Sequence, residues 1–252
     1  MRIRMQMASG NDNMPSDEPR INRTGLKDSE PLNLVWESEA RSGPKIEARA
    51  ALLECAAQAF TTRGYSAATL GHVAELMGAS KGQIYHYYRS KSDLYYDVVV
   101  GAHYMVEQET AKAEKAGIQT PAARLYRIAY AHTMVILEKY AFMRVALEAT
   151  QHQLLSQLSD RQIRANERIK HYRDEYENKI ELIIQQGVEQ GDFKAPSVSI
   201  ATKSVLGSLN WLTVWFDPNK ETTEAEMSEI ARQTAEFVVY GLSPDGPPNL
   251  DL

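Results

Sequence analysis

Lysine, glutamine, tyrosine and histidine side chains crowd the segment SKGQIYHYYRSK at residues 80–91. Successive residues of a helix point about 100° apart, so Tyr85, His86 and Tyr87 cannot all face one apolar core. In the major groove of DNA, Lys and Gln read base edges, aromatic faces contact thymine methyl groups, and tyrosine hydroxyls donate to phosphate oxygens. The pattern therefore predicts a DNA-reading surface made of Lys81, Gln83, Tyr85, His86 and Tyr87.

Ile84 and Tyr88 are four residues apart and are expected on the inner side of the same helix. The hydroxyl of Tyr88 then lies near the core and needs a hydrogen-bond partner. A cluster of aromatic side chains packed between helices is the alternative explanation for the whole run. We keep that interpretation for Tyr88 and not for the three residues before it.

Three short helices are expected to hold this segment in place. Apolar residues at helical spacing run from Ala48 to Phe60 and predict a first helix that ends at Gly64. Thr69 caps a second helix, which Gly78 closes. Ser80 opens the third helix with an S-x-x-Q capping box. Two helices joined by so tight a turn form a helix-turn-helix unit.

The rest of the chain also reads as helices, so the predicted fold is all-α. Helical patterns run from about Lys91 to Lys115 and from Thr120 to a break near Ser159, where a long charged helix begins. The apolar stretch SVSIATKSVLGSLNWLTVWF at 197–216 predicts another helix, and Thr223 caps the last one. The sequence has no strand pattern and no internal repeat.

Composition and motifs exclude several classes of protein. The net charge of -5 means that any nucleic-acid contact must be confined to one small face. No apolar stretch approaches the roughly 20 residues that a membrane helix needs, and a single cysteine fits a reducing cytosol, so we expect a cytoplasmic protein with no membrane partner. No hydrolase, P-loop, zinc-protease or dinucleotide motif is present, and the six histidines are scattered. We therefore expect no catalytic residue, no metal site and no cofactor.

Residues 46–95, IEARAALLECAAQAFTTRGYSAATLGHVAELMGASKGQIYHYYRSKSDLY, resemble the DNA-binding domain of the TetR family of transcriptional regulators. The shared signature is A-F-x-x-x-G-Y, then T-L-x-x-V-A, then S-x-G-x-I-Y-x-Y-Y-x-x-K-x-x-L. Gly71 stands where some relatives carry a base-reading arginine, and Tyr88 replaces a common phenylalanine. The resemblance implies base contacts from Lys81, Gln83, Tyr85 and His86 and phosphate contacts from Thr69, Tyr87 and Lys91, with Ser80 and Gly82 completing the DNA-binding set.

The resemblance also implies a homodimer that binds a palindromic double-stranded DNA operator and is released by a small-molecule effector. The apolar helix at 197–216 has more apolar sides than one core requires, which favours pairing, although it could instead be central to its own domain. A repressor is therefore expected, and a DNA-organising protein of the same fold is the alternative. The expected parts are a disordered extension at 1–44, a helix-turn-helix domain at 45–93, an effector-binding and dimerisation domain at 94–242, and a flexible tail at 243–252.

The segment GSLNWLTVWFDP at 207–218, after the long charged helix, resembles the TetR subgroup that responds to acyl-CoA thioesters. A free hydrophobic or aromatic compound is the alternative effector. Packing in the core and solvation on a charged helix face are alternative roles for all the candidate residues. An acyl slot is expected from Tyr172, Tyr176, Asn210, Trp211 and Trp215, with Asn210 as a buried orienting amide, and phosphate partners from Arg144, Arg164, Arg168 and Arg173.

Overall fold

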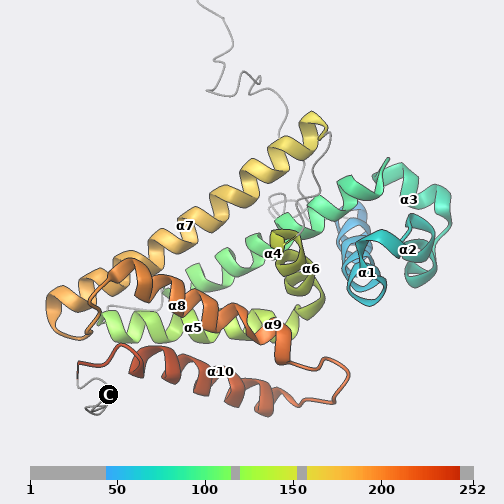
Figure 1. Ribbon diagram of the computed structural model, residues 1–252. Helices are drawn as coiled ribbons and strands as arrows, with labels where there is room; N and C mark the ends of the chain where they lie inside the picture. Colours follow the sequence, from blue (N-terminus) through green and yellow to red (C-terminus); the bar gives the residue numbers. More distant parts are fainter. Residues whose placement is uncertain (1–43, 115–119, 152–157, 245–252) are drawn as a thin grey trace, which may run out of the picture. The chain divides into compact units, whose positions relative to one another are not determined.

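The computed structural model describes residues 44–114, 120–151 and 158–244, and every regular element in these ranges is a helix (Figure 1). The all-α prediction is confirmed for them. The expected extension at 1–44 lies outside the described residues except for Pro44, which begins α1, and most of the expected tail also lies outside them. None of the described helices is long and apolar enough to cross a membrane. The helices are α1 (Pro44–Ala67), α2 (Leu70–Met77), α3 (Lys81–Tyr87), α4 (Lys91–Glu114), α5 (Pro121–Glu138), α6 (Tyr140–Gln151), α7 (Asp160–Gln190), α8 (Val198–Asn210), α9 (Leu212–Trp215) and α10 (Glu224–Tyr240).

The starts of α2 and α3 follow from local sequence, as predicted. The first helix was expected to end at Gly64, but Gly64, with a φ of 72°, marks a kink inside α1, which continues to Ala67. The Thr69 side chain accepts a hydrogen bond from the amide of His72 at the start of α2, and Gly78 ends that helix in the left-handed conformation. Ser80 opens α3 with a complete capping box. The helix-turn-helix is therefore positioned by its caps.

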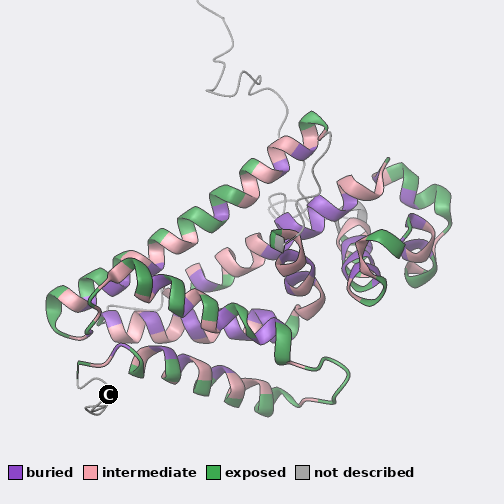
Figure 2. Ribbon diagram, in the orientation of Figure 1, coloured by how far each residue is buried: buried purple, intermediate pink, exposed green. Residues whose placement is uncertain are grey.

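Helix α5 connects two clusters of buried apolar residues. The first cluster contains residues of α1, α2, α3, α4 and α6 and of the C-terminal part of α5. The second cluster contains residues of the N-terminal part of α5 and of α7, α8 and α10. Figure 2 shows the buried residues concentrated along α5 and the first half of α4, whereas α10 keeps an exposed side. Helix α4 contacts α1 as well as α5, α6 and α7, and the residues that it contributes to the clusters all belong to the first one.

Two helix breaks differ from the sequence-based prediction. One helix was expected across residues 120–158, but the structure ends α5 at Glu138 and starts α6 at Tyr140. One helix was also expected across 197–216, but Trp211 separates α8 from α9. Neither site carries a glycine, a proline or a side-chain cap, so no local signal marks it.

A buried glycine lets the end of α7 pack closely against the loop that follows it. A Cβ atom at Gly187 would lie 2.1 Å from the Phe193 ring, which is itself buried. We expect Gly187→Ala to lower the free energy of unfolding by about 2 kcal/mol, because the overpacking cost exceeds the roughly 1 kcal/mol of helix propensity that alanine adds. Urea denaturation measures this change. The double variant Gly187→Ala, Phe193→Leu should lose less free energy of unfolding than Gly187→Ala alone. An equal loss in these two variants would contradict the clash.

Candidate functional site

The outward side of α3 carries the side chains that were predicted to read DNA. Ile84 and Tyr88 are buried, as predicted, and fix the orientation of the helix. Tyr85 is 55% exposed. Tyr87 differs from the prediction, because it is partly buried and packs against the first core cluster. We call the remaining exposed set the reading face; it consists of Ser80, Lys81, Gly82, Gln83, Tyr85 and His86.

The capping box of α3 also limits how Gln83 can act. The Ser80 amide donates to Oε1 of Gln83 at 2.8 Å, and the Gln83 amide donates to Oγ of Ser80 at 3.3 Å. The cap therefore occupies the side-chain carbonyl of Gln83, whereas its Nε2 donors take no part in the box. Base reading by Gln83 would use these donors. Thr69 is exposed, and its hydroxyl oxygen accepts from the His72 amide at 3.2 Å.

Lys91 has a structural role that its sequence context did not predict. Its ammonium group donates to the backbone carbonyls of Tyr65, Ser66 and Ala68 at 2.7, 3.1 and 3.0 Å. It also lies 4.5 Å from the centre of the Tyr65 ring. An ammonium group has three donors, and these carbonyls take all of them. Lys91 thus fastens the end of α1 to the start of α4, and a phosphate contact would require it to release a carbonyl.

The hydroxyl of Tyr88 has the partner that its burial demands. It donates to Oδ2 of Asp97 at 2.7 Å, and it accepts from Nε of Arg49 at 3.2 Å. Arg161 from α7 donates to both oxygens of Asp97, at 2.8 and 2.7 Å, and Arg49 from α1 donates to Oδ2 at 3.1 Å. Burial, followed by the charge of Asp97, raises the pKa of Tyr88. We call this group the Asp97 junction; it comprises Arg49, Tyr88, Asp97 and Arg161.

Three of the predicted effector residues lie together between α4 and α7. Arg168, Tyr172 and Tyr176 line a pocket of about 420 Å³, and the Arg168 guanidinium lies 5.1 Å from the centre of the Tyr172 ring. The same pocket is lined by charged and polar side chains of both helices. These are Tyr104, Glu107, Gln108, His171, Glu175 and Lys179.

The other predicted arginines are spread along the molecule. Arg164 lies on α7, and its buried Nε atom has no hydrogen-bond partner. Arg173 is exposed on the same helix. Arg144 belongs to α6, where it donates to Oε1 of Glu148 at 3.0 Å and to the carbonyl of Thr213 at 3.3 Å. The structure therefore does not bring Arg144 to the pocket between α4 and α7.

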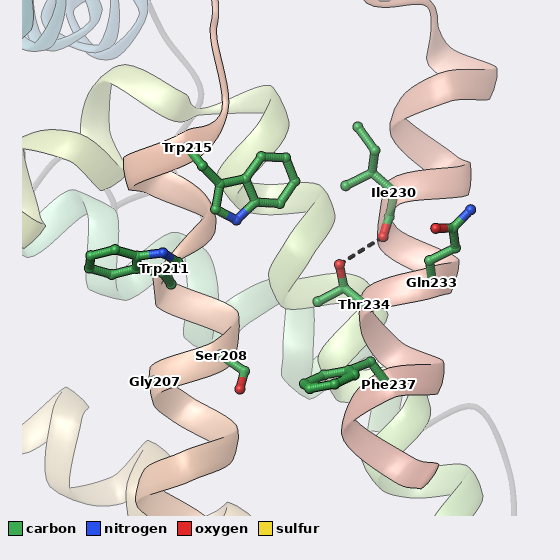
Figure 3. A pocket seen from close by; sticks show the side chains of 8 residues that line it. All are labelled: Gly207, Ser208, Trp211, Trp215, Ile230, Gln233, Thr234 and Phe237. Atoms are coloured by element: carbon green, nitrogen blue, oxygen red, sulfur yellow. Dashed lines mark hydrogen bonds between the residues drawn. The ribbon is translucent and has the colours of Figure 1, made fainter. Parts of the chain in front are cut away.

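The pocket that holds Tyr172 and Tyr176 is not lined by Asn210, Trp211 or Trp215. Asn210 is exposed rather than buried, and its amide donates to the Leu206 carbonyl at 2.8 Å. Trp211 and Trp215 are 62% and 55% exposed and do not line the pocket that holds the tyrosines. Both line a groove of about 610 Å³ between α8–α9 and α10, and in Figure 3 the Trp215 ring points toward α10 whereas the Trp211 ring points away from it. The groove is lined by Gly207, Ser208, Trp211, Trp215, Ile230, Gln233, Thr234 and Phe237.

Three residues of α4 and α5 that were not predicted as site residues carry buried polar atoms. His132 and Thr133 on α5 are 3% and 0% exposed, and the Nε2 atom of His103 on α4 is buried. Nδ1 of His132 lies 2.8 Å from the Tyr176 hydroxyl. Burial lowers the pKa of both histidines to about 4. These histidines are far apart in sequence, so only the packing of α4 on α5 brings them together.

Comparison with known proteins places this arrangement in a family. A family model described as "Bacterial regulatory proteins, tetR family" matches residues 52–98, and one described as "Tetracyclin repressor-like, C-terminal domain" matches 119–242. The curated regulator YhgD of Bacillus subtilis (strain 168), named an uncharacterized HTH-type transcriptional regulator, is 24% identical over 79% of this chain and 98% of its own.

Solved structures agree with this assignment. The crystal structure of the TetR family transcriptional regulator PfmR from Thermus thermophilus is 30% identical, covers 76% of this chain and 98% of PfmR, and gives a TM-score of 0.64. The structure of AibR in complex with isovaleryl coenzyme A and operator DNA, 20% identical over 78% of this chain and 98% of AibR, shares the fold with a TM-score of 0.60. The helix-turn-helix with its exposed reading helix, the match of both family models and the likeness to PfmR show that the chain belongs to the TetR family of transcriptional regulators.

Proposed function

We propose that the protein is a repressor that binds a palindromic operator as a homodimer and leaves it when an acyl-CoA thioester binds. In this proposal residues 45–93 form the DNA-binding domain and residues 94–242 form the effector-binding and dimerisation domain. The observation that carries the proposal is the reading face, because α3 keeps its polar and aromatic side chains in solvent while Ile84 anchors its inner side. A surface used only for solvation has no need of an exposed tyrosine beside lysine and glutamine.

An exposed apolar surface on α8, α9 and α10 supports the homodimer. We call this surface the pairing face; it consists of Ile200, Trp211, Trp215, Phe237 and Tyr240, each more than half exposed. Soluble proteins rarely leave such a patch uncovered, and burying each large side chain contributes about 1.5–3 kcal/mol. Two copies related by a two-fold axis would cover one pairing face with the other. The symmetric dimer would then present two reading faces to two half-sites.

The pocket between α4 and α7 supports the thioester as effector. It combines aromatic walls from Tyr172 and Tyr176 with the cationic groups of Arg168 and Lys179. Guanidinium and ammonium groups bind phosphate, and aromatic walls suit an acyl chain. AibR, which shares this fold, was crystallised with isovaleryl coenzyme A and operator DNA. Glu107 and Glu175 also line this pocket, and their negative charges oppose the binding of an anionic ligand.

The test of DNA reading is selection of genomic DNA fragments by the purified protein, followed by affinity measurement on the selected fragment. We expect Tyr85→Ala to weaken binding by at least about tenfold, because each lost base contact is worth about 1–3 kcal/mol and a dimer loses two. Fluorescence anisotropy measures the dissociation constant, and the melting temperature should not change because the side chain is exposed.

The matched control is Leu182→Ala, since Leu182 is also exposed (57%) but lies on α7. It should bind the fragment as the wild type does. Undiminished binding by Tyr85→Ala would remove α3 from the interface. Few selected sites near promoters would indicate a regulator, whereas many dispersed sites would indicate a DNA-organising protein.

A further inference from the structure

The side chain of Gln83 on the reading face is oriented by the backbone of its own helix. The Ser80 amide donates to Oε1 of Gln83 at 2.8 Å, and the Gln83 amide donates to Oγ of Ser80 at 3.3 Å. A backbone amide can only donate, so the side-chain atom that faces it must be the oxygen. Gln83 is exposed. It therefore offers the two donors of Nε2 to a partner outside the chain, whereas its oxygen is turned toward the backbone.

A second glutamine of this chain shows how such a side chain binds. Ser159 and Gln162 form the same capping box at the start of α7, where the Ser159 amide donates to Oε1 of Gln162 at 3.2 Å. Nε2 of Gln162 donates to two acceptors, Oγ of Ser92 at 2.8 Å and Oδ1 of Asp93 at 3.1 Å. A glutamine held in a capping box thus binds through its nitrogen and bridges two neighbouring acceptors.

The four bases differ in what they offer such a nitrogen in the major groove. Guanine presents two acceptors, N7 and O6, whereas adenine presents one acceptor beside the N6 donor. Thymine offers a single acceptor, and cytosine offers a donor. Glutamine ordinarily binds adenine through both its oxygen and its nitrogen, but in this chain the oxygen faces the Ser80 amide. Guanine is then the one base that matches two donors with two acceptors.

We propose that Gln83 selects guanine in each half-site of the operator by donating from Nε2 to N7 and O6, and that its capping box with Ser80 disfavours adenine. This inference rests on the proposed DNA reading by α3 and deepens it by assigning a base. Ser80 acts as a positioning residue, since it fixes the orientation of the Gln83 amide without touching the base. The hydrogen bonds that start the helix thus also decide which base it accepts.

Another capping box of this chain supplies a substitution that separates the two tasks of Gln83. At the start of α10 the Thr223 amide donates to Oε2 of Glu226 at 2.8 Å, and the Glu226 amide donates to Oγ1 of Thr223 at 3.2 Å. Gln83→Glu should therefore keep the box while removing both donors of Nε2. A carboxylate accepts from N4 of cytosine, so the variant should prefer that base.

The experiment selects double-stranded DNA from a random library with the full-length wild type and with Gln83→Glu, and it compares the two base profiles. One position of each half-site should change, from guanine with the wild type to cytosine with the variant. The added negative charge weakens binding to every sequence, so base preference is compared as a ratio of affinities within each protein. The wild type should prefer guanine to adenine at this position by at least about tenfold, since a dimer makes the contact twice.

A modified base tests the acceptor atom without changing the protein. 7-Deazaguanine pairs as guanine does but lacks the N7 acceptor, so it should weaken wild-type binding about fivefold per half-site, the effect of one hydrogen bond. Fluorescence anisotropy on the selected site measures this change. Equal affinity for 7-deazaguanine and guanine would contradict the contact. This measurement does not depend on the folding of any variant.

Glu226→Gln is the matched control, because it makes the reverse exchange in the capping box of α10, outside the reading face. It should select the same DNA as the wild type and bind it with the same affinity. Gln83→Glu should melt at the wild-type temperature or higher, since the box remains and a carboxylate interacts favourably with the start of a helix. A lower melting temperature would show that glutamate does not replace glutamine in this box.

The outcomes separate this inference from the proposed function. A base other than guanine at the position that changes would overturn the assignment. Identical profiles of the wild type and Gln83→Glu would show that Gln83 reads no base. Both results leave α3 as the reading helix if Tyr85→Ala still loses binding. Selection of no preferred sequence by the wild type would overturn the inference and the proposed operator recognition together.

Discussion

Replacing Phe237 by aspartate is expected to turn the protein into a monomer that no longer holds its operator. Phe237 is 67% exposed and lines the groove of Figure 3 together with Trp211 and Trp215, and its ring points from α10 toward the helix that carries Ser208. Each pairing face would lose about 1.5–3 kcal/mol of apolar burial and gain a charge that must be desolvated, and a two-fold interface contains the change twice. We therefore expect the dimer dissociation constant to rise by about 10³-fold or more, as measured by sedimentation velocity.

Loss of operator binding follows from loss of the dimer, because a single reading face contacts one half-site. Leu182→Asp is the matched control, since it places the same charge at an exposed leucine on α7. That variant should remain a dimer and bind DNA normally. A dimeric Phe237→Asp protein would show that the pairing face is not the subunit interface.

Removing the carboxylate of Asp97 should have the largest effect on folding stability. Asp97 is 1% exposed and accepts hydrogen bonds from Arg49, Tyr88 and Arg161. Removing one partner of a buried ion pair typically costs about 3–5 kcal/mol. The arginine side chains are 21% and 31% exposed, so water can solvate them in part. We expect Asp97→Ala to lower the free energy of unfolding by about 3 kcal/mol, measured by urea denaturation.

Glu177→Ala provides the comparison, because the Glu177–Lys203 ion pair is exposed. Such pairs contribute about 0–1 kcal/mol, so this variant should stay within about 1 kcal/mol of the wild type. Tyr88→Phe should cost about 2 kcal/mol, since it removes the two hydrogen bonds of the hydroxyl, to Asp97 and from Arg49, and keeps the ring. Equal stability of the Asp97 and Glu177 variants would mean that the Asp97 junction contributes nothing to folding.

Local signals in the sequence were sufficient for the helix-turn-helix. The caps at Thr69 and Ser80 act over three residues, so their residue types predict the start of α2 and α3 without knowledge of the fold. The four-residue spacing of Ile84 and Tyr88 predicted the buried side of α3 for the same reason. The break at Lys139 carries no glycine or proline, so local sequence did not predict the end of α5 there.

The effector region was harder to predict because its residues meet only through tertiary packing. Helical spacing showed that Trp211 and Trp215 share a side, but it could not show whether that side meets the core or a second subunit. His132 was dismissed as one of several scattered histidines, since its contact with Tyr176 joins α5 to α7 across 44 residues. Lys91 was expected to contact a DNA phosphate, because the family resemblance gives this role to its position. The resemblance does not show that backbone carbonyls of this chain bind the same ammonium group.

The Asp97 junction has a mechanical consequence for the DNA-binding helices. Its two guanidinium groups come from α1 and α7, while the carboxylate between them belongs to α4. A swivel of α1 against α7 that lengthens either contact leaves a carboxylate that is only 1% exposed with fewer donors. The junction therefore favours the present mutual angle of the two helices.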